Sequence, residues 1–292
     1  MSRLIWNSWS ATLRRISRGD VTVGDHRHLI FASDQQLQHL ASAKTWYIDG
    51  TFKIVSKTFV QLLSIHFFAR SGDDMKQLPG IYVLMPRKRK DYKQVFARIF
   101  ELMPSPPVTE LLVGDFEEGM WRAAKSVLRG VRIHGCAFHW GQAVWRHVQE
   151  LGLQMDYSQR YGVFKFVRKL LALPFLPEEQ IPVAFNTLKE TVTSERLIQL
   201  TNYIERTWIN VDIWTPSSWT VYRMAVRTNN DVEGWHHRIN RRAQKSSLSF
   251  YVLVILLFKE TASIPNQLKM ISEGKLRRYQ RKTTRLLQCH IN

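Results

Sequence analysis

Residues 45–54 read Thr-Trp-Tyr-Ile-Asp-Gly-Thr-Phe-Lys-Ile. The β-branched and aromatic residues before the acid predict a strand. Asp49 lies near the end of this strand, where a rigid backbone would hold its carboxylate in place. An Asp-Gly pair is also common in plain turns, so the motif alone leaves the role of Asp49 open.

Two further acidic motifs lie downstream. Residues 113–117 read Val-Gly-Asp-Phe-Glu and place Asp115 at the end of another apolar strand pattern. Residues 228–234 read Thr-Asn-Asn-Asp-Val-Glu-Gly and place Glu233 near the start of a helical pattern. Asp115 could instead be a helix N-cap, and Glu233 a first-turn acid favoured by the helix dipole. Asp231 is a competing candidate beside Glu233.

The elements around these motifs alternate between strand and helix. The patterns predict strands over 45–54, 59–69, 80–85, 109–115 and 131–138, and helices over 92–103, 117–128, 142–151 and 230–244. Short connections between the first three strands favour an antiparallel meander. We therefore predict an α/β fold, a mixed five-stranded sheet flanked by helices with an inserted all-helical subdomain.

The predicted organisation has five segments. They are an N-terminal helical segment (1–44), the first part of the core (45–155), a helical insertion (156–220), the last part of the core with the third acid (221–260), and a basic C-terminal tail (261–292).

Composition indicates a folded, strongly basic protein. Of 292 residues, 45% are hydrophobic, and 42 Lys and Arg against 24 Asp and Glu give a net charge of +18. Such an excess attracts polyanions, and nucleic acid is the usual one, although a merely soluble basic protein is the plain alternative. Two cysteines cannot build a disulfide framework. The longest apolar run, 250–258, is far short of the about 20 residues of a membrane helix, so no membrane is expected.

Together the motifs resemble the transposase domain of Mutator-like elements. The resemblance covers residues 31–242 and is carried by the segments 49–53, 82–86, 114–117, 135–140 and 228–234. It implies a DDE-type cut-and-paste transposase on a ribonuclease H-like fold. In that fold the first and fourth strands lie side by side, which would bring Asp49 and Asp115 together, and a late helix would deliver Glu233.

Three converging carboxylates could hold two Mg2+ or Mn2+ ions. Two such ions activate the attacking oxygen and neutralise the leaving oxygen of a phosphodiester. Mg2+ prefers oxygen ligands and needs few of them from the protein. We expect Asp49 to bridge both ions, with Asp115 and Glu233 each holding one.

Other residues are candidates for support of this site. The family's Cys-x-x-His element is matched by Cys136 and His139, which we expect to support the active site. A zinc site is the alternative, with Cys289 as the only other cysteine. His237 and Arg241 recur at four-residue steps from Glu233 and could meet the scissile phosphate, or simply lie on a solvated helix face.

The expected partner is double-stranded DNA, at both element ends and target. Candidate contacts are Lys53, Arg87, Lys88, Arg89, Lys90, Arg241 and Arg242. The cluster at 87–90 could also be a nuclear import patch, and we expect a nuclear protein. Trp208, Trp214, Trp219 and Trp235 could stack on unpaired bases or pack in the core. Synapsis of two ends would require a homo-oligomer.

Two other functions remain open at the level of sequence. A transposase usually has a separate module for end recognition, and the 44 residues before the first motif lack the cysteines of a zinc finger. The chain could thus be a domesticated, catalytically silent DNA-binding protein. A housekeeping ribonuclease H-like nuclease is a third possibility, and cleavage assays separate the three.

Overall fold

The computed structural model describes residues 15–56, 58–72, 74–86, 91–224, 226 and 230–276. They divide into two compact units. The first combines the described residues up to Ile133 with those from Asn230 onward, and the second comprises those between His134 and residue 226.

A mixed seven-stranded sheet forms the centre of the fold, in the order β1-β2-β5-β4-β3-β6-β7. Its strands are β1 (Ser17–Val23), β2 (His26–Phe31), β3 (Thr45–Thr51), β4 (Gln61–Ser71), β5 (Asp74–Met85), β6 (Leu111–Gly114) and β7 (Arg132–Gly135). The predicted α/β class is confirmed, but the prediction of five strands was wrong.

The strand pairing brings distant segments together as expected. β3, β4 and β5 form the predicted antiparallel meander. β3 also pairs with β6 in parallel, with Tyr47 opposite Val113. The first and fourth predicted strands therefore lie side by side. Asp49, near the end of β3, and Asp115, directly after β6, lie toward the same ends of these two parallel strands.

The two additional strands come from the segment predicted to be helical. β1 and β2 form an antiparallel hairpin, and β2 pairs with β5. The run Val21-Thr22-Val23 is β-branched, and Gly24 adopts a φ of 57°, which supports a tight turn. Only α2 (Asp34–Ala41), capped by Ser33, is helical between residues 17 and 44. Residues 1–14 lie outside the described part.

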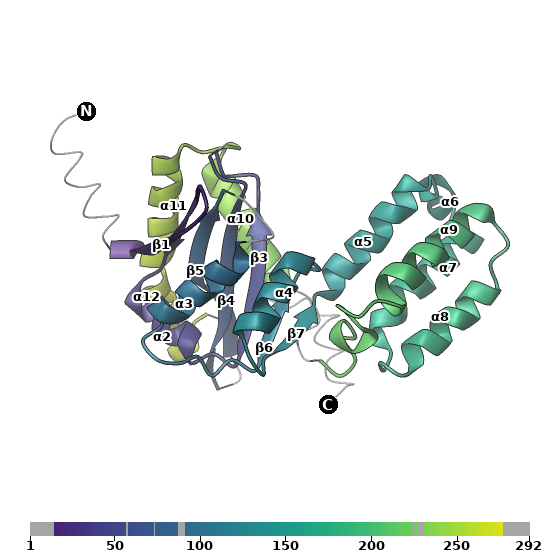
Figure 1. Cartoon of the computed structure of the whole chain (residues 1–292), viewed down its shortest axis with the longest axis horizontal. Coiled ribbons are helices and arrows are strands. Elements are labelled where there is room, and N and C mark those ends of the chain that lie inside the picture. The colour runs from purple at the N-terminus through teal and green to yellow at the C-terminus, as the bar shows by residue number, and fades with distance from the viewer. Residues whose placement is uncertain are drawn as a thin grey trace. The chain divides into compact units, whose positions relative to one another are not determined.

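Helices cover both faces of the sheet (Figure 1). α3 (Tyr92–Leu102) and α4 (Glu118–Val127) lie on one side, and α10 (Asn230–Ala243) and α11 (Phe250–Ala262) on the other. A further helix, α12 (Ile264–Ser272), occupies part of the segment predicted to be a basic tail and contacts β4 and β5. Its buried residues Ile264 and Ile271 are seven apart and share one helix face.

One apolar cluster fixes α10 on the sheet. Trp235 and Ile239 of α10 pack with Leu62, Tyr82 and Leu84 of β4 and β5. The Trp235 ring stacks on Tyr82 at 5.7 Å between centroids. Because Trp235 is only 4% exposed, its role is core packing, not base stacking.

The second unit is helical. It contains α5 (Ala137–Glu150), α6 (Gln154–Ser158), α7 (Gly162–Ala172), α8 (Gln180–Glu190) and α9 (Glu195–Ile204), with a π-type turn at Glu205–Ile209 and short 3-10 turns at Leu173–Phe175 and Pro216–Ser218. Trp140 stacks on Trp219 and meets Trp208 edge-on, so these tryptophans also form core. No helix in the described parts of the chain has the length and apolar character to span a membrane.

Candidate metal centre

Asp49 is held by β3, an interior strand of the sheet between β4 and β6. Its side chain is 8% exposed, and its Oδ1 accepts a hydrogen bond of 2.7 Å from the backbone N of Gly50. Side chains alternate between faces along a strand. Asp49 is paired with Ser64, whereas the adjacent Gly50 is paired with Leu63. Thr51, on the same face as Asp49, is paired with Leu62, which packs in one cluster with Trp235 of α10, so Asp49 lies on the face that α10 covers.

The helix α10 brings two more potential ligands to Asp49. Glu233 and His236 are three residues apart and share one helix face. Ligand atoms of Asp49, Glu233 and His236 all lie within 4.8 Å of one another. Nδ1 of His236 lies 3.6 Å from Oδ2 of Asp49. The apolar anchoring of Trp235, between these two residues in sequence, positions the group.

Asp115 shares a small cavity with Asp49. The cavity measures about 50 Å3, and its lining includes Asp49, Asp115, Glu117, Gln61 and Tyr92. Asp115 is exposed, and its Oδ1 accepts a 2.6 Å bond from the backbone N of Phe116. Asp49 thus belongs both to the group with α10 and to the cavity that Asp115 lines.

A hydrogen-bond chain connects three residues that line this cavity. Gln61 Nε2 donates to the hydroxyl of Tyr92 at 2.8 Å, and Tyr92 donates to Oε2 of Glu117 at 2.9 Å. Burial, followed by the charge of Glu117, raises the pKa of Tyr92 far above its ordinary value. Tyr92 therefore stays a neutral donor, and it holds the Glu117 carboxylate at the cavity.

His66 of β4 packs against α10 beside the metal-ligand candidates. Its ring is fully buried, meets Trp235 edge-on at 5.0 Å, and its Nε2 is 2.9 Å from Ser64 Oγ. Burial, then the proximity of His236 and Arg238, lowers the pKa of His66 well below its ordinary value. His66 is therefore a neutral member of the core at neutral pH.

The donor set fits a divalent cation. Oxygen and nitrogen ligands lie about 2.0–2.2 Å from a bound Zn2+ or Mg2+, so ligands of one ion are at most about 4.4 Å apart. The ligand atoms of Asp49, Glu233 and His236 lie within 4.8 Å of one another, close to that limit, and the Asp49–His236 pair at 3.6 Å is inside it. An imidazole beside two carboxylates suits Mn2+ or Zn2+ better than Mg2+, which prefers oxygen alone.

His236 is the member of this group that the sequence interpretation missed. His237 was chosen for its four-residue spacing from Glu233, but it is exposed and is not in the group. The apolar pattern of α10 carried the missing signal, since Val232, Trp235 and Ile239 mark the buried face and His236 lies on it. Asp231 is also outside the group.

The other predicted site residues lie elsewhere. Cys136 and His139 are buried at the start of α5, in the second unit, where the His139 ring contacts Phe138 at 5.6 Å. Lys53 is exposed, and Arg241 and Arg242 lie in the last turn of α10. Arg87, Lys88, Arg89, Lys90 and Cys289 fall outside the described residues.

No protein-family model matches this chain, and a search of curated proteins found no match either. The resemblance to Mutator-like transposases therefore rests on the motifs and their order. The arrangement of the acids is an independent physical observation.

Proposed function

We propose that this chain is a DDE-type DNA transposase catalytic domain of the Mutator-like class, on a ribonuclease H-like fold. The order of its elements supports this proposal, since a three-stranded meander is followed by a parallel strand on the β3 edge. The net charge of +18 suits a polyanionic substrate.

One observation carries the proposal. Asp49 lies within ligand distance of Glu233 and lines the same cavity as Asp115, although 184 residues separate the first pair (233 − 49). Asp49 is therefore the residue best placed to be shared by two ions. Glu233 with His236 would hold one ion, and Asp115 the other.

The ions would supply an activated oxygen nucleophile and relief of charge on the leaving oxygen. The chain's own residues do the rest. β3 and α10 hold the ligands on rigid elements, which limits reorganisation during the reaction. Tyr92 fixes Glu117 beside Asp115, and Arg241 and Arg242 in the last turn of α10 would bind the substrate's phosphates.

Metal-dependent nicking of DNA tests the proposal. Asp49→Asn, Asp115→Asn and Glu233→Gln should each lower Mg2+- or Mn2+-dependent strand cleavage by about 100-fold or more, since each removes a charge from the ion site. Binding to duplex DNA, measured in EDTA, should stay close to wild type.

Glu101→Gln is a matched control. Glu101 is 63% exposed on α3 and pairs only with Arg98 among the bonds that the structure describes, so its loss should leave cleavage unchanged. Cleavage at the wild-type rate by Asp49→Asn would reject the assignment of the site.

A silent, transposase-derived DNA-binding protein is the second candidate, favoured by the basic face of α10. It predicts salt-sensitive binding to duplex DNA without cleavage in either metal. A preference for terminal-repeat duplexes over RNA–DNA hybrids separates a transposase from a housekeeping nuclease.

A further inference from the structure

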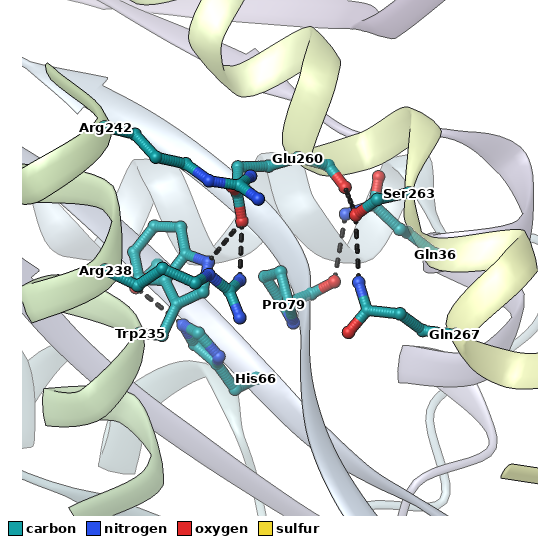
Figure 2. A network of polar contacts seen from close by, with 10 residues as sticks. Gln36, His66, Pro79, Trp235, Arg238, Arg242, Glu260, Ser263 and Gln267 are labelled. Carbon is teal, nitrogen blue, oxygen red and sulfur yellow. Dashed lines mark hydrogen bonds and ion pairs between the residues drawn. The ribbon is translucent and has the colours of Figure 1, made fainter. Parts of the chain in front are cut away.

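Glu260 of α11 is a buried carboxylate that binds two arginines of α10. It is 1% exposed. Its Oε2 accepts hydrogen bonds from Arg238 Nη2 at 2.7 Å and from Trp235 Nε1 at 3.0 Å, and its Oε1 accepts one from Arg242 Nη1. Figure 2 shows both guanidinium groups converging on this carboxylate. Burying a charge costs several kcal/mol unless it is paired and hydrogen-bonded, as it is here.

Both arginines keep hydrogen-bond donors that Glu260 does not occupy. Their side chains remain 40% and 51% exposed, for Arg238 and Arg242 respectively. A guanidinium has five N–H donors in a planar fork, so one edge can bind Glu260 while another reaches solvent. Their positions four residues apart place both forks on one face of α10. Glu260 therefore fixes two exposed donor groups that would otherwise sample many rotamers.

These arginines line a surface hollow whose charged side chains are all positive. The hollow has a volume of about 300 Å3 and is lined by His237, Arg238, Arg241 and Arg242. None of the described lining residues is acidic. Fixed guanidinium forks suit the oxygens of a phosphate group, which they can bind in bidentate fashion. The chemistry of the hollow is that of a phosphodiester site.

We propose that Glu260 preorganises Arg238 and Arg242 so that they bind, with Arg241 and His237, the phosphodiester backbone of duplex DNA beside the acidic centre. The choice of DNA as the polyanion rests on the proposed function. Glu233 and Arg241 are eight residues apart on α10, or ~12 Å at the rise of a helix. The duplex rises ~3.4 Å per base pair along its axis, so with α10 along the duplex this separation corresponds to about three to four base pairs between the hollow and the cleaved bond.

Removing the charge of Glu260 should change DNA affinity in opposite directions, depending on whether Glu260 preorganises the arginines. Glu260→Gln makes the protein more positive, so an unorganised basic surface would bind DNA more tightly. Preorganisation predicts the reverse, because the forks lose their charged partner and must be ordered on binding. We expect about five- to tenfold weaker binding of a short fluorescent duplex, measured by anisotropy in EDTA. Circular dichroism shows whether the variant is folded.

Arginine-to-lysine variants keep the charge that Glu260 needs and so do not depend on Glu260→Gln folding. Arg238→Lys and Arg242→Lys retain a cation but lose the planar fork. Each should weaken binding by about five- to tenfold. Arg122→Lys is the matched control, since Arg122 pairs with Glu118 on the exposed face of α4, and it should stay within about twofold of wild type.

The salt dependence identifies phosphate as the ligand. Arg241 has no part in the Glu260 contacts described above, and Arg241→Ala should lower the slope of log affinity against log salt by about 0.9, or one phosphate contact. The inference is overturned if folded Glu260→Gln binds as tightly as wild type, or if both lysine variants match Arg122→Lys. All readouts are metal-free, so they are separate from a failure of Asp49→Asn to lose cleavage.

Discussion

At the residue scale, His236 and His237 are neighbours on α10 with different surroundings. His236 is buried and lies beside Asp49 and the half-buried Glu233, whereas His237 is exposed beside the arginines. We expect His236→Ala to weaken Mn2+ binding by about tenfold or more. Mg2+ binding should weaken less, because imidazole is a better ligand for Mn2+ than for Mg2+. Titration calorimetry with each metal measures this. His237→Ala is the control and should bind Mn2+ like wild type, and equal affinities of the two variants would contradict the ligand role of His236.

The sequence singled out the two acids that lie together at α10, but not the histidine beside them. Asp49 and Glu233 could be named because each lies in a short motif whose order along the chain is specific. Spacing from Glu233 alone does not distinguish His236 from His237, since three- and four-residue steps both lie on its side of a helix. The apolar positions Val232, Trp235 and Ile239 do distinguish them, because they mark the face that the packing of Trp235 against Tyr82 buries.

At the scale of elements, the close approach of β6 to its neighbours positions Asp115. A Cβ on Gly114 would lie 2.8 Å from Ile48 Cγ2 and 2.9 Å from Met120 Cε. Gly114→Ala should therefore overpack β6 against β3 and α4 and lower the free energy of unfolding by about 1–3 kcal/mol. Gly234→Ala, with open space around its Cβ on α10, should raise it by about 0.5–1 kcal/mol. Urea unfolding measures both, and a Gly114→Ala variant as stable as wild type would show that β6 can shift.

The same scale explains which elements could be predicted. The pairing of β3 with β6 followed from element order, because a parallel pair needs a crossover and α3 occupies it. The β1–β2 hairpin was missed, since β1 is polar and partly exposed and the pairing of β2 with β5 is a long-range contact. α12 was missed because Lys269 and the basic residues beyond it masked a short apolar stripe.

At the scale of the whole molecule, buried histidines link stability to pH. Burial lowers the pKa of His28, His39 and His66, and that of His66 most clearly. The unfolded chain then binds protons below about pH 6.5 that the folded chain does not. The contribution of these neutral histidines to stability is therefore present above about pH 6.5 and is lost as the pH falls below it, at up to about 1.4 kcal/mol per pH unit for one buried histidine.

We expect His66→Gln to reduce this pH dependence, although the substitution also lowers stability at neutral pH. The quantity to compare is the slope of the unfolding free energy between pH 7.5 and 5.5, measured in urea and EDTA. His237→Gln removes an exposed histidine from the same unit and should keep the wild-type slope. If His66→Gln and wild type lose stability equally on acidification, then His66 must take up its proton in the folded state. Its burial between Ser64 and Trp235 would in that case have to open in mild acid.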